Sequence, residues 1–208
     1  MTRNQSKEII ALAKETVLRE ARALEALADQ FDENMIPVID LLLACQGHVL
    51  VSGAGTSRAM AERLAHLFSC SGRPALFISA ADSLHGTAGA VTDKDVVYLI
   101  SKGGHSAEVN QFAAIAKDRG AKVIAQTENP DSPLGKMSDA VYHIVTVGEV
   151  DPFDGLVAIG SSLVNGAAGD ALCATMLLLT HYSFERFAKT HPGGEVGVKL
   201  AQRAEGNE

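Results

Sequence analysis

Glycine, hydroxyl and cationic side chains gather in one short segment near the middle of the chain. Residues 101–106 read Ser-Lys-Gly-Gly-His-Ser; an apolar run at 95–100 precedes them, and apolar residues at helical spacing follow from Val109. A strand, a glycine-rich turn and a helix in this order place backbone N–H groups and the positive end of a helix on an anion. The glycine spacing fits neither the dinucleotide nor the triphosphate pattern. The segment therefore predicts a site for a small phosphorylated ligand; the alternative is a tight turn that merely needs glycine.

An earlier segment repeats this arrangement. Residues 53–57 read Gly-Ala-Gly-Thr-Ser, after an apolar run at 48–52 and before apolar residues at helical spacing within 60–68. Thr56 and Ser57 contribute hydroxyl groups here. Two such turns favour a phosphate site more strongly than either alone, if the fold brings them together.

The elements that would position these turns are short apolar segments alternating with segments of helical periodicity. This alternation predicts an α/β fold: a five-stranded parallel sheet between two helix layers, a three-layer αβα sandwich of flavodoxin-like order 2-1-3-4-5. In that order the first and third strands flank the switch point, where ligands bind beyond the carboxyl ends of the strands. The expected strands are 48–52, 75–79, 95–100, 122–127 and 140–145.

Long helices are expected at both ends of the chain. Residues 6–31 keep an apolar helical stripe that is broader than one small domain needs, so this helix either covers an edge of the core or pairs with a second subunit. We divide the chain into an N-terminal helix, 1–32, and a main domain, 33–208. A second long helix is expected at 156–190, with a last short turn after it. The surplus of apolar face predicts a homodimer or homotetramer.

Composition narrows the possible partners and compartment. The formal net charge is -7, and the chain has no basic cluster of five residues, which argues against nucleic acid or an anionic membrane as partner. No signal peptide is apparent at the N-terminus, and the apolar run at 171–179 is too short to span a bilayer. The three cysteines are widely spaced and form no metal-ligand pair, so we expect free thiols in a reducing cytoplasm and no metal.

Several segments together resemble the sugar-isomerase (SIS) domain family over about residues 33–200. They are the two turns described above, a His85-Gly86 loop, Glu149 in an acidic loop, and a terminal His191-Pro-Gly-Gly194. The terminal motif after a long helix makes the arabinose-5-phosphate isomerase branch the closest. The resemblance implies a flavodoxin-like fold and a phosphosugar aldose–ketose isomerase that works through an enediolate, with a phosphorylated sugar as ligand.

The resemblance also implies roles for individual residues. His85 would match a histidine that reaches a neighbouring subunit's site, because SIS proteins bind substrate where protomers meet. The remaining catalytic positions would be Glu108, Glu149 and His191. The residues that would hold the sugar phosphate are Thr56, Ser57, Ser101, Lys102, Gly103 and Ser106.

The chemistry of isomerisation suits these residue types, although each has a structural alternative. Moving a proton between adjacent carbons needs a base and a donor that stabilises the enediolate, and it needs no metal or redox cofactor. The unperturbed pKa of a histidine such as His191 lies near neutrality, which suits ring opening; the alternative is a helix C-terminal cap. Glu149 could be a solvated loop charge, Glu108 could stabilise a helix N-terminus, and His85 could serve a structural hydrogen bond.

Two departures from the branch leave the substrate open. Thr56 stands where the branch carries a lysine, and we expect no C-terminal pair of regulatory CBS domains because the chain stops at Glu208. The alternatives are therefore a hexulose-6-phosphate, heptose-phosphate or sugar-acid phosphate isomerase, or a non-catalytic module that binds a sugar phosphate.

Overall fold

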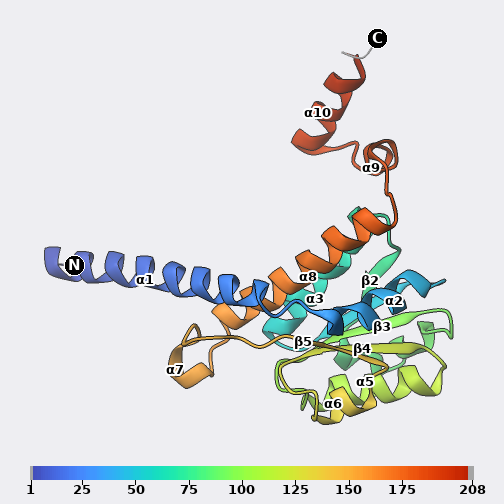
Figure 1. Ribbon diagram of the computed structural model, residues 1–208, viewed down its shortest axis with the longest axis horizontal. Helices are drawn as coiled ribbons and strands as arrows, with labels where there is room; N and C mark the ends of the chain where they lie inside the picture. The colour runs from blue at the N-terminus through green and yellow to red at the C-terminus, as the bar shows by residue number, and fades with distance from the viewer. Residues whose placement is uncertain (1, 206–208) are drawn as a thin grey trace.

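The computed structural model describes residues 2–205 and contains one five-stranded parallel sheet (Figure 1). The strand order is β2-β1-β3-β4-β5, which confirms the predicted flavodoxin-like order. In the pairing of β1 with β3, Gly53 lies opposite Ile100, so these two central strands end at the same level. The turns that follow them must therefore be neighbours. The strands are β1 (Val49–Gly53), β2 (Ala75–Phe77), β3 (Val96–Ile100), β4 (Lys122–Thr127) and β5 (Ala140–His143).

Helices cover both faces of the sheet and complete the predicted three-layer sandwich. One apolar core is centred on Phe68 and Tyr98 between the sheet and α2, α3 and α8, and the other surrounds Phe112 on the opposite face. The helices of the first face are α2 (Ile36–Ala44), α3 (Thr56–Cys70) and α8 (Gly160–Leu179); those of the second are α4 (Ala80–Ser83), α5 (Ala107–Asp118) and α6 (Pro133–Met137). Short connecting turns are η1 (Glu33–Met35), η2 (Thr87–Ala90) and α7 (Pro152–Gly155).

A buried polar chain ties α8 to the middle of the sheet. The hydroxyl of Tyr98 donates to Gln126 Oε1 over 2.7 Å, and Gln126 Nε2 donates to Asn165 Oδ1 over 2.8 Å. Burial raises the pKa of Tyr98 well above its usual value, so the phenol stays a neutral donor. Because every link is satisfied, this chain fixes α8, and with it the acidic loop that precedes α8, relative to β3 and β4.

The helix α8 is a core element with closely packed neighbours. By length and composition it is the one helix within residues 2–205 that could cross a membrane. Half of it is nevertheless buried in the sandwich, including Leu172 and Met176. A Cβ at Gly166 or Gly169 would lie 3.0 Å from side-chain atoms of α3, so these glycines permit the close approach of the two helices.

The predicted continuous helix over 156–190 is wrong. The chain leaves α8 at Leu179, takes a left-handed conformation at His181 with φ of 48°, and restarts as α9 (Phe184–Thr190). Ser183 caps the new helix by accepting the backbone N–H of Arg186 over 3.3 Å. The expected last short turn is also wrong, because α10 (Gly194–Glu205) is a helix of 12 residues. The two helices form an arm that projects away from the sandwich (Figure 1).

The first helix projects in the same manner. It spans Arg3–Ala28, within a few residues of the predicted 6–31, and only Ala23 and Leu27 are buried. Figure 1 shows its N-terminal half extending beyond the sandwich. Ile9 and Leu12 on this half, and Val17 just after it, are more than half exposed. The C-terminal part of this helix therefore packs against the core, while apolar residues of its N-terminal half face solvent.

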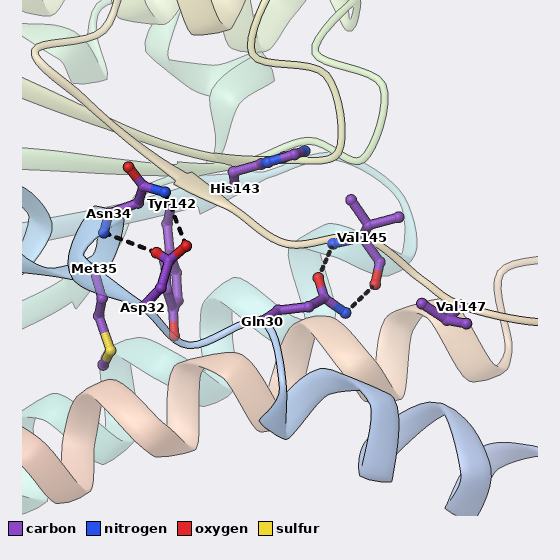
Figure 2. A pocket seen from close by; sticks show the side chains of 8 residues that line it. All are labelled: Gln30, Asp32, Asn34, Met35, Tyr142, His143, Val145 and Val147. Carbon is purple, nitrogen blue, oxygen red and sulfur yellow. Dashed lines mark hydrogen bonds between the residues drawn. The ribbon is translucent and has the colours of Figure 1, made fainter.

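The segment after the first helix covers the open edge of the sheet just beyond the end of β5. Gln30 Nε2 donates to the carbonyl of Val145 over 2.9 Å, and Gln30 Oε1 accepts the N–H of Val145 over 2.8 Å. Figure 2 shows this reciprocal pair at one end of a cavity of about 340 Å³, with Asp32 and Tyr142 at the other. The side-chain amide thus occupies backbone groups that an edge strand otherwise leaves open to another chain.

Replacing Gln30 with alanine should destabilise the fold measurably. Losing two hydrogen bonds is expected to lower the free energy of unfolding by about 1–2 kcal/mol, which lowers Tm by about 2–8 °C for a protein of this size. Calorimetric melting of Gln30→Ala and of the control Gln111→Ala, at an exposed position on α5, measures the difference. Equal melting temperatures for the two variants would show that the edge contact contributes nothing.

Candidate active site

The first glycine turn joins β1 to α3. A Cβ at Gly53 would lie 2.9 Å from the backbone of Ser57 and 3.0 Å from the carbonyl oxygen of Ile100, so glycine is required for the turn to pass so close to β3. Gly55, at the N-cap of α3, has φ of 58° and offers no side chain to the first helical turn. Thr56 and Ser57 begin the helix, with Thr56 exposed and Ser57 half-buried. Backbone N–H groups and two hydroxyls are therefore presented together at a helix N-terminus.

The second glycine turn joins β3 to α5 and lies beside the first. Ser101 is buried, and its Oγ lies 3.4 Å from Oγ of Ser106. Ser106 stands at the N-cap of α5, yet its hydroxyl does not cap the helix. Gly103 is exposed between them, where its backbone can meet a ligand. Two hydroxyls and a second helix N-terminus thus face the same edge of the sheet as Ser57, in the arrangement that suits a phosphate group.

Gly104 should be the least replaceable residue of this turn. Its φ is +69°, and a Cβ there would clash with the side chain of Ser132. We expect Gly104→Ala to lower the free energy of unfolding by at least about 2 kcal/mol, since both strain and a clash oppose it. A Cβ at Gly103 would find its nearest atom at 3.9 Å. In thermal unfolding, we therefore expect the Tm of Gly103→Ala to stay close to that of the wild type. An equal fall in Tm for the two variants would contradict this explanation.

An ion pair ties the acidic loop between β5 and α8 to the second turn. Lys102 Nζ lies 3.1 Å from Oδ2 of Asp151, whose side chain is only 3% exposed. The other carboxylate oxygen accepts the backbone N–H groups of Ile159 over 2.8 Å and Ser161 over 3.0 Å. Burial by itself would raise the pKa of Asp151, but these hydrogen bonds outweigh burial and hold the pKa below its usual value. The carboxylate therefore stays ionised at neutral pH.

The three predicted acidic and histidine residues near this edge come from three different parts of the chain. Glu149 is exposed two residues before Asp151 and lines a cleft of about 800 Å³ between the acidic loop and α1. Glu108 is half-buried in the first turn of α5, directly after the second glycine turn. His85 is exposed after α4, a short helix that packs against α5. All three therefore lie on the side of the sheet that carries the two turns.

His191 lies elsewhere in its own chain. Its Nδ1 donates to the carbonyl of Phe187 over 2.9 Å, and its ring stacks on the Phe187 ring with centroids 3.8 Å apart. Since a carbonyl only accepts, Nε2 carries the lone pair, and it faces the Cys70 thiol at 3.4 Å. Cys70 ends α3 and Ser57 begins it, so about 20 Å of helix separate His191 from the first turn. The structure does not bring His191 to the phosphate turns of the same chain.

Sequence reasoning gave no role to three residues at this edge. Asp151 was visible only as one charge of the acidic loop, and its partner Lys102 is 49 positions away. Glu128 directly follows β4, and its backbone N–H donates to the Lys102 carbonyl over 2.9 Å. Its place as a polar residue at the end of a strand is the sequence feature that could have identified it. Arg19 of α1 reaches the Glu149 carbonyl at 3.5 Å, which no local pattern indicates. Among the described residues, no group of three His, Cys, Asp or Glu is placed to hold a metal ion.

Fold and site together define an α/β protein with two glycine turns and two helix N-termini at the switch point of its sheet, an arrangement that suits an anion. The chain belongs to the SIS domain family, whose model matches residues 42–174. Two similar curated proteins are the arabinose 5-phosphate isomerase KpsF of Escherichia coli, 32% identical over 94% of this chain, and KdsD of Pseudomonas aeruginosa, 31% identical over 99%. This chain spans 60% and 63% of their lengths.

Solved structures agree with this placement. A protein of E. coli CFT073 in complex with arabinose 5-phosphate is 31% identical, with a TM-score of 0.85, and the match covers 92% of this chain and all of that one. A protein of Listeria monocytogenes is 32% identical, with a TM-score of 0.86, covering 93% of this chain and all of that one. The resemblance to the SIS family, and to its arabinose-5-phosphate isomerase branch, is thereby confirmed.

Proposed function

We propose that this protein is a phosphosugar aldose–ketose isomerase that interconverts arabinose 5-phosphate and its 2-ketose, ribulose 5-phosphate. One observation carries the proposal: the turns after β1 and β3 lie side by side and present hydroxyls that cap neither of the two helices beginning there. The similar proteins named above support the choice of substrate. In this assignment the phosphate is held by Thr56, Ser57, Ser101, Gly103 and Ser106.

The proton transfer is assigned to the carboxylates near the second turn. Glu149 takes the proton from C2 of the open-chain aldose and then delivers a proton to C1. The O2 proton passes to O1 in the enediolate, so that C1 gains a hydroxyl and C2 becomes the carbonyl. Glu108 is the second carboxylate of the site. His191 is the acid/base that opens the sugar ring, and the lone pair of its Nε2 is the proton acceptor.

The position of His191 requires that the site be built from more than one copy of the chain. Its distance from its own phosphate turns, the projecting arm that carries it, and the exposed apolar residues of α1 and α10 all support a homo-oligomer. His85 is likewise assigned to a neighbouring copy's site. Light scattering should give a multiple of the monomer mass at micromolar concentration; a monomer mass would overturn this part of the proposal. The three free thiols support a reducing cytoplasm as the location.

Proton exchange with solvent tests the reaction itself. The purified protein is incubated with arabinose 5-phosphate in deuterium oxide and followed by proton NMR, with hexulose, heptose and sugar-acid phosphates as a comparison panel. We expect ribulose 5-phosphate to form, with deuterium entering at the carbon that receives the proton. If the protein turned over only another member of the panel, that sugar phosphate would replace arabinose 5-phosphate as the assigned substrate. Binding without any turnover would favour a sensor of sugar phosphates.

A further inference from the structure

The direction of the Lys102 side chain is fixed at both of its ends. Its backbone carbonyl accepts the hydroxyl of Thr127 and the N–H of Glu128, each over 2.9 Å. Its ammonium group meets Asp151, which is itself held by two backbone N–H groups at the start of α8. The cation therefore bridges from the phosphate turn to the acidic loop, instead of lying over the glycines that follow it.

The phosphate group has ligands enough without this cation. Two helices, α3 and α5, begin at the turns, which also carry the hydroxyls of Ser57, Ser101 and Ser106. Moving Lys102 onto the phosphate would leave the carboxylate of Asp151, only 3% exposed, without its cation. Only one of the three ammonium N–H groups is needed for Asp151, so two remain for oxygens of a ligand.

Resting on the proposed function, we propose that Asp151 is a positioning residue that aims Lys102 at the reacting carbons, and that Lys102 stabilises the enediolate oxygens instead of the phosphate. An open-chain sugar held by its phosphate at the two turns extends toward Glu149 in the acidic loop. The Lys102 side chain likewise runs from the second turn to the acidic loop, so it lies beside the sugar carbons. A fixed cation where negative charge develops lowers the barrier, because it needs no reorganisation during the reaction. The depressed pKa of Asp151 keeps its carboxylate ionised at neutral pH.

Separate measurements of binding and turnover test this assignment. Arabinitol 5-phosphate, the reduced substrate, carries the phosphate and cannot isomerise, so its Kd reports binding alone. We expect Lys102→Ala to lower kcat by about 100-fold or more, as for loss of an oxyanion donor, and to change this Kd by less than about threefold. Asp151→Asn should lower kcat by about tenfold with little change in Kd, and it should have no further effect on kcat in the Lys102→Ala background.

A second ion pair supplies a matched control. Lys117 Nζ lies 2.9 Å from Oδ2 of Asp139, whose carboxylate also accepts a backbone N–H, but this pair stands near the amino ends of β4 and β5. Lys117→Ala and Asp139→Asn should lower Tm while leaving kcat within about twofold.

The outcomes separate this inference from the proposed function. Suppose that the wild type isomerises the substrate, and that Lys102→Ala weakens the binding of arabinitol 5-phosphate by about tenfold but retains the wild-type kcat. Lys102 is then a phosphate ligand, and the inference is overturned. A further tenfold loss from Asp151→Asn in the Lys102→Ala background would show that Asp151 does not act through Lys102. A wild type with no turnover of any sugar phosphate overturns the proposed function, and this inference falls with it.

Discussion

Replacing His191 with alanine is expected to lower kcat by about 10²–10⁴-fold, the usual contribution of a general acid–base group. The lone pair of Nε2 is the group lost, and the substrate's phosphate contacts lie on other elements, so KM should change little. A coupled assay of ketose formation measures the effect. His48→Ala is the control, since it removes an exposed imidazole just before β1, at the opposite edge of the sheet. Turnover by His191→Ala at the control's rate would remove His191 from the mechanism.

Mixing two inactive variants tests where this histidine acts. One protomer carries His191→Ala, and the other carries Ser101→Ala together with Ser106→Ala, which removes both hydroxyls of the second turn. If each site combines the turns of one copy with His191 of another, randomly mixed dimers should recover about a quarter of the wild-type rate. If the mixture is no more active than the sum of the two variants measured separately, the whole site lies within one chain. That result would contradict a site built from two copies.

Replacing Glu149 with glutamine should have an effect of comparable size. The amide keeps the shape of the side chain but cannot take a proton, so kcat is expected to fall by about 10²–10⁴-fold while the Kd for arabinitol 5-phosphate stays near its wild-type value. Asp154→Asn is the matched control, because Asp154 is an exposed carboxylate of the same loop, and asparagine tolerates its φ of 53°. Equal kcat values for the two variants would mean that Glu149 is only a solvated loop charge.

The parts of the fold that local sequence patterns determine could be predicted. Apolar runs of strand length that alternate with segments of helical period predicted the strands and their order. The two glycine turns were found in the same way, because adjacent parallel strands that end together bring their turns together. The break at His181 and the helix α10 could not be predicted. Whether that segment stays helical depends on tertiary contacts, such as the Tyr182 ring packed over Gly72, and not on periodicity.

The site shows the same division between local and distant information. The hydroxyls of Ser101 and Ser106 could be predicted because five residues separate them on one turn. The pairing of Lys102 with Asp151 joins residues 49 positions apart, and only the fold shows which acidic residue of the loop meets the lysine. The distance between His191 and the glycine turns of its own chain likewise could not be predicted. It follows from the length of α3, because His191 contacts Cys70 at the end of that helix.

The central claim is that the two glycine turns hold the phosphate of a sugar while groups from the acidic loop and from another copy move one proton. A crystal structure of the protein with arabinitol 5-phosphate tests it most directly. We expect the phosphate within hydrogen-bond distance of the hydroxyls of Ser57, Ser101 and Ser106, with carbons 1 and 2 near Glu149 and with His191 supplied by a neighbouring copy. A phosphate bound elsewhere, with both turns empty, would contradict the claim.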